Sequence, residues 1–210
     1  MYITTKYMNI LYYIASYMRI LPRKAGQFFV NKYYGIANHN TNRMIQLPLT
    51  RKVWNHVENL YLEPTEILPG IYLGNAYNAS NYRTIDKFNI KTIVNVSKEL
   101  PNFFEKNTSI QYFQIPIKDD SENHLSEFIR PAIDFLDLNG PYDENNSVLI
   151  HCYMGSSRSA SIVLLYLIYK YQYSYSAALE LLRARRPIVN INTNFLKDIY
   201  DFYYEEPLII

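Results

Sequence analysis

The sequence predicts an α/β domain built on a mainly parallel central sheet flanked by helices. Two apolar runs with β-branched residues, 91–96 (KTIVNV) and 148–151 (VLIH), are typical of strands buried on both faces. Segments with apolar residues at helical spacing lie between and after these runs, so strands and helices alternate along the chain. Alternation of this kind favours helices layered against a parallel sheet.

The individual elements of this domain, expected at 63–206, follow from the same patterns. Strands are expected at 67–73, 91–96, 111–117 and 148–151, and helices at 76–88, 125–138, 157–171, 175–185 and 192–204. The 125–138 helix is amphipathic, because its apolar residues include positions 125, 128, 129, 132, 133 and 136. The last strand runs into a glycine-containing turn before the next helix, so this turn is expected at the carboxyl end of a buried strand.

Residues 1–62 differ in composition and are expected to form an aromatic and apolar N-terminal extension. Five residues at helical spacing predict an amphipathic helix: Tyr7, Ile10, Ile14, Tyr17 and Leu21. This helix packs on the main domain, contacts a membrane surface through residues 1–24, or acts as a targeting segment. Asn9 and Ser16 interrupt the apolar run, which is short for a bilayer span. The polar stretch 38–51 is expected to be a linker.

Composition narrows the class of protein. Of the 210 residues, 49% are hydrophobic and 19% are charged, which provides apolar material for a sizeable core. The formal net charge of +2 does not favour a nucleic-acid partner, which usually requires a basic surface. Cys152 is the single cysteine, so no internal disulfide is expected, and a cytoplasmic or other reducing compartment is favoured. The oligomeric state is left open.

The segment 151–159 (HCYMGSSRS) has the features of an anion-binding loop. It lies between a buried strand and a helix expected to begin near Ser157, where backbone N–H groups converge on an anion. Five residues separate Cys152 from Arg158, so the sulfur and the guanidinium can reach one oxyanion. Arginine suits this role because its planar fork holds two phosphate oxygens and stays charged. Gly155 lets the backbone fold tightly.

The same surroundings are expected to activate the thiol. A helix N-terminus with nearby cations lowers a cysteine pKa from ~8.5 to roughly 3.5–7.5, so Cys152 should be a thiolate at neutral pH. Ser159 can donate a hydrogen bond to the sulfur and ease its departure from a phosphorylated intermediate. His151 supports the loop from behind, either as a buried structural residue or by tuning the thiol pKa. The residues expected to bind the phosphate are Tyr153, Met154, Gly155, Ser156, Ser157 and Arg158.

The motif HCxxGxxRS between a strand and a helix resembles the signature loop of protein-tyrosine and dual-specificity phosphatases. Three further segments, 66–80, 93–104 and 115–125, resemble the catalytic domains of MAP-kinase phosphatases. The resemblance implies a three-layer protein-tyrosine-phosphatase-like fold, phosphorylated protein substrates, and hydrolysis without a metal or other cofactor. It also implies that Cys152 forms a cysteinyl-phosphate which water then hydrolyses. Phosphotyrosine is the implied substrate, with phosphoserine and phosphothreonine as further ones.

The resemblance also implies an aspartate as general acid, and two residues compete for this role. Asp119 and Asp120 both follow the strand that is expected to end near Ile117. In the family the acid lies six residues before the apolar residue that opens the next helix. Leu125 is that residue here, so the spacing favours Asp119 over Asp120. A poor leaving group such as an alkoxide needs this proton.

Two other functions are weighed against a protein phosphatase. A lipid phosphatase would act on phosphoinositides or phosphatidylglycerophosphate with the same loop, but inositide-specific relatives usually carry lysines inside it. A pseudophosphatase would bind phosphorylated proteins without turnover, but such proteins typically lack the cysteine, the arginine or the acid. Near the C-terminus the chain departs from the family, because Ile191 and Asn194 stand where proline and a small residue are usual. This departure concerns the local loop geometry at 185–195 and not the chemistry, and asparagine tolerates a left-handed backbone better than most residues.

Overall fold

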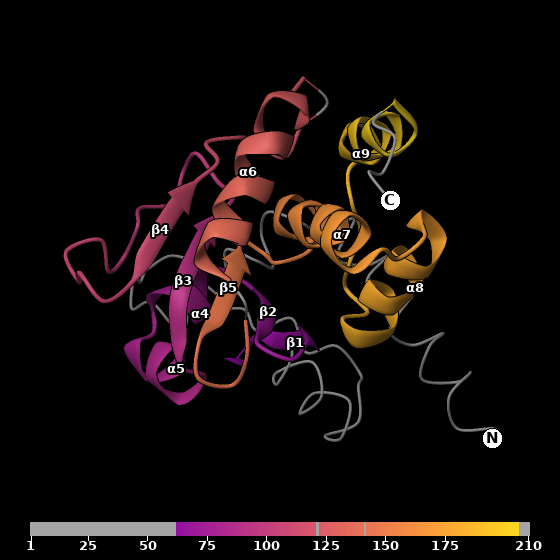
Figure 1. The fold of residues 1–210 in the computed structure, drawn as a ribbon. Coiled ribbons are helices and arrows are strands. Elements are labelled where there is room, and N and C mark those ends of the chain that lie inside the picture. The colour runs from indigo at the N-terminus through magenta and orange to yellow at the C-terminus, as the bar shows by residue number, and fades with distance from the viewer. Residues whose placement is uncertain (1–61, 121, 141, 206–210) are drawn as a thin grey trace, which may run out of the picture. The chain divides into compact units, whose positions relative to one another are not determined.

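The computed structural model describes residues 62–120, 122–140 and 142–205, and a five-stranded sheet with the order β1-β2-β5-β3-β4 lies at its centre (Figure 1). The strands are β1 (Thr65–Leu68), β2 (Ile71–Gly74), β3 (Ile90–Asn95), β4 (Gln111–Gln114) and β5 (Ser147–His151). Only the β1–β2 pair is antiparallel among these neighbours. The predicted α/β class with a mainly parallel sheet is confirmed.

Helices cover both faces of the sheet, which gives three layers (Figure 1). Two short helices pack on β2, β3 and β5 from one side: α4 (Ala76–Ser80) and α5 (Tyr82–Lys87). The longer helices lie on the other side: α6 (Ser126–Asn139), α7 (Arg158–Tyr171), α8 (Tyr175–Arg185) and α9 (Thr193–Glu205). Of these, α7 contacts β5 and β2, α8 contacts β1, and α6 contacts β4; α6, α8 and α9 also pack against α7.

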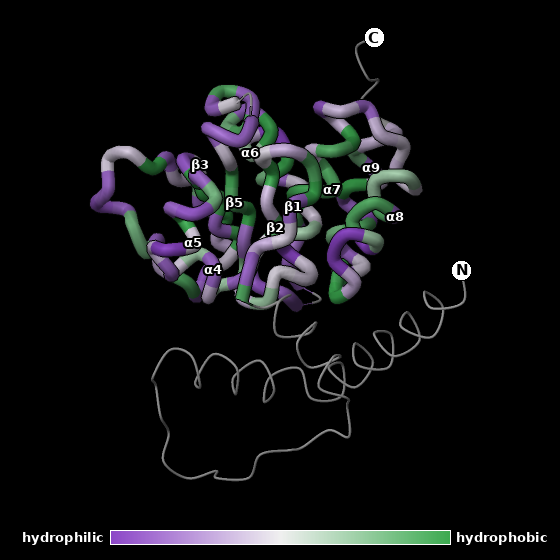
Figure 2. Tube along the Cα trace, turned by 90° about the horizontal axis from the view of Figure 1, so that it is seen from below, coloured by the Kyte–Doolittle hydropathy of each residue, from purple (hydrophilic) through white to green (hydrophobic). Residues whose placement is uncertain are grey.

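The β5 strand separates two hydrophobic clusters. Val148 and Ile150 belong to the larger cluster, on the side of α6 to α9, while Leu149 belongs to the smaller cluster with Ile85 and Ile93. All five residues of β5 are buried, and the hydrophobic stretches of β5 and α7 are evident in Figure 2. This burial on both faces explains why the central residues of β5, 148–150, are all apolar rather than alternating with polar ones.

The prediction of one continuous strand at 67–73 was wrong, because the chain forms a β1–β2 hairpin there. Pro69 and Gly70 make the turn, and Gly70 has a φ of +75°. An added Cβ at Gly70 would lie 2.6 Å from the backbone nitrogen of Asp143, so the turn requires glycine for space as well as for backbone conformation. The Pro-Gly pair was the signal in the sequence that indicates such a turn.

The helix predicted at 76–88 is divided into α4 and α5 by Asn81, whose backbone is extended (φ −95°, ψ 106°). The side chain of Asn81 accepts a hydrogen bond from the backbone N–H of Arg83 at 3.1 Å and so caps α5. The strand predicted at 111–117 also ends earlier, at Gln114. The other predicted helices and strands agree with the structure to within one or two residues.

Several predictions lie outside the described residues. These are the N-terminal amphipathic helix, the 38–51 linker and most of the boundary between extension and domain. Among the described helices none is both long enough and apolar enough to cross a membrane.

Candidate active site

β5 delivers Cys152 to the start of a tight loop, and α7 begins at the end of this loop with Arg158. The structure therefore brings the predicted residues 152–159 together. Five of these residues are buried, and three are half-buried: Tyr153, Met154 and Ser156. Gly155 has a φ of +70°, and a Cβ there would collide with the carbonyl oxygen of Gly74. Glycine is thus required for this turn of the loop.

The sulfur of Cys152 lies within reach of several hydrogen-bond donors of the loop. The backbone N–H of Gly155 donates to Sγ at 3.3 Å, and the Ser159 hydroxyl donates at 3.2 Å. Burial alone would raise the pKa of the Cys152 thiol, but the charge of Arg158 and the donors of Ser159 and Gly155 outweigh it and lower the pKa. The structure thus favours a thiolate, the nucleophilic form of cysteine.

Arg158 is almost fully buried and its guanidinium is held by two other loops. Nη2 donates to Oε1 of Glu99 at 2.7 Å, and Nη1 donates to Oε2 of Glu99 at 2.9 Å and to the carbonyl of Ile117 at 3.1 Å. The buried Nε–H has no hydrogen-bond partner among the described residues. A buried unpaired donor of a charged group is unfavourable unless an acceptor binds it, so the Nε edge is suited to an oxyanion.

Asp119 and Asp120 have different environments, although they are adjacent in sequence. The hydroxyl of Ser157 donates to Oδ1 of Asp119 at 2.8 Å. This contact connects Asp119 to the loop of residues 152–159, which is called the phosphate loop below. The carboxylate of Asp120 instead accepts hydrogen bonds from the backbone of Glu122 and from Asn123. Asp120 therefore stabilises its own turn, and the geometry favours Asp119 as the residue that can act at the site.

Asn192 connects the segment of Asp119 and Asp120 to the phosphate loop by two hydrogen bonds. Its backbone N–H donates to the Ser157 hydroxyl at 3.1 Å, and its side-chain Nδ2 donates to the carbonyl oxygen of Asp120 at 2.7 Å. Ser157 is the N-cap residue of α7, but its side chain makes no capping hydrogen bond and contacts Asp119 instead. The segment around Ile191, which departs from the family pattern, thus still approaches the loop through its neighbour.

The phosphate loop is braced from outside by Arg186, a fully buried residue that sequence reasoning did not single out. Its Nε donates to the carbonyl of Gly155 at 2.8 Å, and Nη1 donates to Oγ1 of Thr65 at 2.8 Å. The Ser156 hydroxyl donates to the carbonyl of Ile188 at 2.7 Å on the same side. Arg186 thus fixes the carbonyl of Gly155, and the Ser156 side chain attaches the loop to the segment after α8.

His151, predicted to support the loop, is fully buried behind it at the end of β5. Neither ring nitrogen has a hydrogen-bond partner of normal geometry among the described residues. Burial lowers the pKa of His151 to about 4, and the charge of Arg158 acts in the same direction. The lowered pKa favours the neutral form of His151, whose ring is packed behind the loop.

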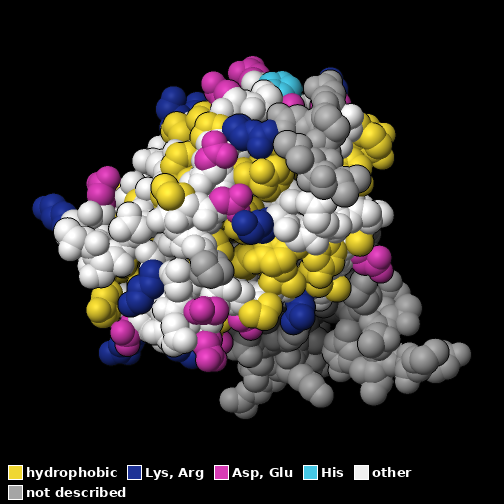
Figure 3. Space-filling model, viewed as in Figure 1, with side chains coloured by type: hydrophobic (Ala, Val, Ile, Leu, Met, Phe, Trp, Pro, Cys, Tyr) yellow, Lys and Arg dark blue, Asp and Glu magenta, His cyan; other side chains and the backbone are white. Residues whose placement is uncertain are grey.

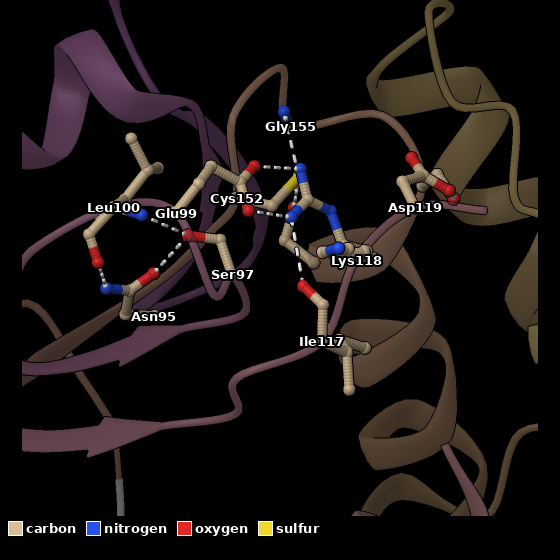
Figure 4. A network of polar contacts seen from close by, with 12 residues as sticks. Asn95, Ser97, Glu99, Leu100, Ile117, Lys118, Asp119, Cys152 and Gly155 are labelled. Atoms are coloured by element: carbon tan, nitrogen blue, oxygen red, sulfur yellow. Dashed lines mark hydrogen bonds and ion pairs between the residues drawn. The ribbon is translucent and has the colours of Figure 1, made fainter. Parts of the chain in front are cut away.

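Around the site, Glu99 and Asp119 lie on opposite sides of Cys152 in the view of Figure 4. Glu99 was also missed by sequence reasoning, because it lies 59 residues from Arg158. Its pKa is lowered, since the hydrogen bonds and charge of Arg158 outweigh the opposing effect of burial. Within the described ranges, no group of three or more metal-binding side chains comes together.

Comparisons with known proteins give consistent matches. The family model described as the dual specificity phosphatase catalytic domain matches residues 71–205. The human protein named dual specificity protein phosphatase 9 is 40% identical over 139 residues, which cover 66% of this chain and 36% of that protein. The crystal structure of DUSP15 has a TM-score of 0.60 and 28% identity, and the match covers 68% of this chain and 88% of that chain.

A further solved structure matches to a similar extent. The human tyrosine phosphatase-like serine/threonine/tyrosine-interacting protein matches with a TM-score of 0.61 and 25% identity, over 68% of this chain and 97% of that chain. The chain spans about a third of the length of the curated relatives it matches first.

Proposed function

The chain belongs to the family of dual specificity phosphatase catalytic domains, and from this premise we propose that it hydrolyses phosphotyrosine and phosphoserine or phosphothreonine in proteins. One observation carries the proposal: a thiol of lowered pKa lies beside a buried arginine that has an unpaired Nε–H. This pair supplies both a nucleophile and a binding edge for a phosphate dianion. The Tyr153, Met154, Ser156 and Ser157 side chains in the loop carry no charge, which suits a substrate with one phosphate.

In the first step, the Cys152 thiolate attacks phosphorus and the bond to the substrate oxygen breaks. The backbone N–H groups of the loop and the Nε edge of Arg158 bind the phosphate oxygens during the attack. Asp119, held at the loop by Ser157, gives its proton to the leaving oxygen. The products of this step are the dephosphorylated side chain and a cysteinyl-phosphate.

In the second step, water hydrolyses the cysteinyl-phosphate. Asp119, now ionised, accepts a proton from the water as it attacks phosphorus, and the sulfur leaves as a thiolate. The Ser159 hydroxyl and the Gly155 N–H stabilise the negative charge that returns to Sγ. Inorganic phosphate is released, and the site is restored to its starting protonation.

The test is turnover by the full chain, with a chelator present, on matched phosphotyrosine and phosphothreonine peptides and on a set of phosphoinositides. We expect hydrolysis of both peptides, and its loss in Cys152→Ser with retained binding of the phosphopeptide. Hydrolysis of lipids alone would replace the proposal by a lipid phosphatase. Peptide binding by the wild type without any turnover would replace it by a binding protein.

The assignment of Asp119 is tested in the same assay with a matched control. Asp119→Asn should lower kcat for the peptides by about 100-fold, in the range for general acids, while Asp120→Asn should have a much smaller effect. An aryl phosphate with a strongly acidic phenol needs no proton, so Asp119→Asn should affect its hydrolysis little. The reverse ranking of the two variants would assign the acid to Asp120.

A further inference from the structure

Asp198 of α9 binds the end of the segment that carries the proposed general acid. Its side chain is nearly buried, with 8% of its surface exposed, and its two carboxylate oxygens have different partners. Oδ1 lies 2.9 Å from Nδ1 of His124, and Oδ2 accepts from the backbone N–H of Leu125. We propose that Asp198 is a positioning residue that keeps Asp119 directed toward the leaving oxygen. The inference rests on the proposed function, because it assigns a role in the same reaction.

The segment 118–125, called the acid segment below, is restrained by its own hydrogen bonds. Oδ1 of Asp120 accepts from the backbone N–H of Asn123 at 3.1 Å, and Oδ1 of Asn123 accepts from the backbone N–H of Lys118 at 3.4 Å. These contacts connect the two ends of the segment and limit its internal movement. A displacement at its C-terminal end, where Asp198 binds, is therefore transmitted to Asp119.

The same helix is connected to the acid segment at a second point. Asn192 precedes α9, and its carbonyl accepts a hydrogen bond from the first turn of this helix. Its side chain donates to the carbonyl of Asp120, and its backbone N–H donates to the Ser157 hydroxyl, which in turn donates to Asp119. Asn192 and Asp198 are six residues apart, which corresponds to about 9 Å along a helix axis. The helix thus acts as a rigid spacer between two attachment points of the acid segment.

The alternative role for Asp198 is to attach α9 to the rest of the domain and nothing more. Apolar side chains of α9, among them Phe195 and Ile199, are already fully buried in the larger hydrophobic cluster. The two roles differ in a measurable respect. Loss of a general attachment lowers stability and affects all substrates alike, whereas loss of positioning affects only substrates whose leaving oxygen needs a proton.

The first experiment compares kcat/KM of the full-length wild type and of Asp198→Ala on two aryl phosphates. One substrate has a strongly acidic phenol as its leaving group, and the other is phenyl phosphate, whose leaving oxygen needs a proton. We expect a loss of about tenfold on phenyl phosphate, because shifts of about 1 Å at a reacting site have effects of up to 100-fold. On the ester of the acidic phenol the change should be less than about twofold.

Three further variants serve as controls in the same assay. Asp198→Asn keeps an acceptor for the Leu125 N–H and a polar group beside His124, so it should recover most of the loss. Asp201→Ala removes another carboxylate of α9 and should match the wild type. Ile199→Val weakens the packing of α9, so it should lower the melting temperature without changing the ratio of the two rates. Equal losses on both substrates in Asp198→Ala would overturn the assignment.

A double variant tests whether Asp198 acts through Asp119. In an Asp119→Asn background the proton donor is absent, so adding Asp198→Ala should cause little further loss on phenyl phosphate. Two losses that multiply would mean that Asp198 affects another step, and the assignment would then be wrong.

Hydrogen exchange provides a measurement that does not require turnover. In Asp198→Ala the amides of the acid segment should exchange faster, while those of the phosphate loop and α7 should exchange as in the wild type. Unchanged exchange in the acid segment, or faster exchange throughout the domain, would contradict a positioning role. A wild type that hydrolyses neither aryl phosphate contradicts the proposed function, and the exchange pattern then still decides whether Asp198 holds the acid segment.

Discussion

At the scale of single residues, the hydroxyl of Ser159 stabilises the Cys152 thiolate at two points of the proposed reaction, before the attack on phosphorus and when the sulfur leaves. It donates to Sγ of Cys152 at 3.2 Å, and it is fully buried, so water does not compete for this contact. A hydrogen bond to a charged group is worth about 1.5–3 kcal/mol, which corresponds to roughly one or two pKa units. Ser159 is therefore expected to affect both the ionisation of the thiol and its departure from phosphorus.

Ser159→Ala should raise the thiol pKa and move the acid limb of the kcat/KM profile to higher pH. The sign follows because the folded protein lowers this pKa, despite the opposing effect of burial. Because the thiol pKa is lower in the folded protein, the thiolate stabilises the fold fully at pH values above the thiol pKa of the unfolded chain. This stabilisation is lost as the pH falls through the thiol pKa of the folded protein, and in the variant the loss occurs at a higher pH. Alkylation rates between pH 5 and about 9 measure the shift.

The same variant should also accumulate cysteinyl-phosphate, because the sulfur leaves less readily. A larger burst of released product before steady state would show this accumulation. An unchanged alkylation profile with an unchanged burst would mean that the contact with Ser159 contributes nothing to the reaction.

At this scale the sequence predicts which residues lie together where they are contiguous in the chain, but it does not reveal contacts that only the fold creates. Cys152, Arg158 and Ser159 lie in one loop, so their spacing predicts that they lie close together, as the structure shows. Glu99 and Arg186 approach the same loop from 59 and 31 residues away. Neither carries a local signal, because an acidic residue in a loop and an arginine after a helix are common on any surface.

At the scale of elements, the phosphate loop depends on a backbone conformation that Gly155 alone supplies. Its φ is +70°, and an added Cβ would lie 2.8 Å from Nη2 of Arg186, besides colliding with the carbonyl of Gly74. A left-handed backbone costs other residues about 1–2 kcal/mol before any collision. The loop would therefore move away from both β2 and Arg186.

Gly155→Ala should lower kcat/KM by at least about tenfold, because shifts of about 1 Å at a reacting site have effects of up to 100-fold. Gly140→Ala is the matched control, since Gly140 has a φ of −82° and its Cβ would meet the Leu136 carbonyl at 3.3 Å. Peptide turnover and thermal unfolding of both variants provide the test. Activity in Gly155→Ala equal to that of the control would show that the loop tolerates the displacement.

The helices and strands were predicted well where apolar residues recur at regular spacing over a long segment. They were predicted poorly where a single residue changes the direction of the chain. The helices α6 to α9 have periodic patterns over 11 to 14 residues, and their predicted bounds hold to within one or two residues. The β1–β2 hairpin and the break between α4 and α5 were missed. Each depends on a single position, Gly70 or Asn81, inside a stretch whose pattern predicts one continuous element.

At the scale of the whole molecule, the distribution of charge and apolar surface is consistent with the small net charge. On the face seen in Figure 3, basic and acidic side chains are interspersed and hydrophobic side chains lie between them. Large apolar or aromatic side chains are exposed on the helices of the larger layer, among them Leu138, Tyr171, Tyr200 and Tyr204. The described residues on this face therefore do not form the single-sign stripe that binds nucleic acids.

The chain divides into two compact units, Met1–Leu60 and Tyr61–Ile210, and we propose that the second is an independent catalytic domain. The larger hydrophobic cluster of the described residues extends from Ile67 to Ile199, and both hydrophobic clusters lie within the second unit. A length of about 150 residues is typical of domains that fold alone. A protein consisting of residues 61–210 should therefore unfold in one cooperative transition and retain the kcat/KM of the full chain.

A deeper truncation that begins at Ala76 is the matched control. It removes the β1–β2 hairpin with Ile67, Ile71 and Leu73 of the core, and also Thr65, which accepts from the buried Arg186. We expect this shorter protein to be unfolded or aggregated, because it loses three buried side chains worth about 1.5–3 kcal/mol each and leaves a buried cation short of a partner. Denaturant unfolding and peptide turnover distinguish the two truncations. Aggregation or loss of activity in residues 61–210 would show instead that the first 60 residues complete the catalytic domain.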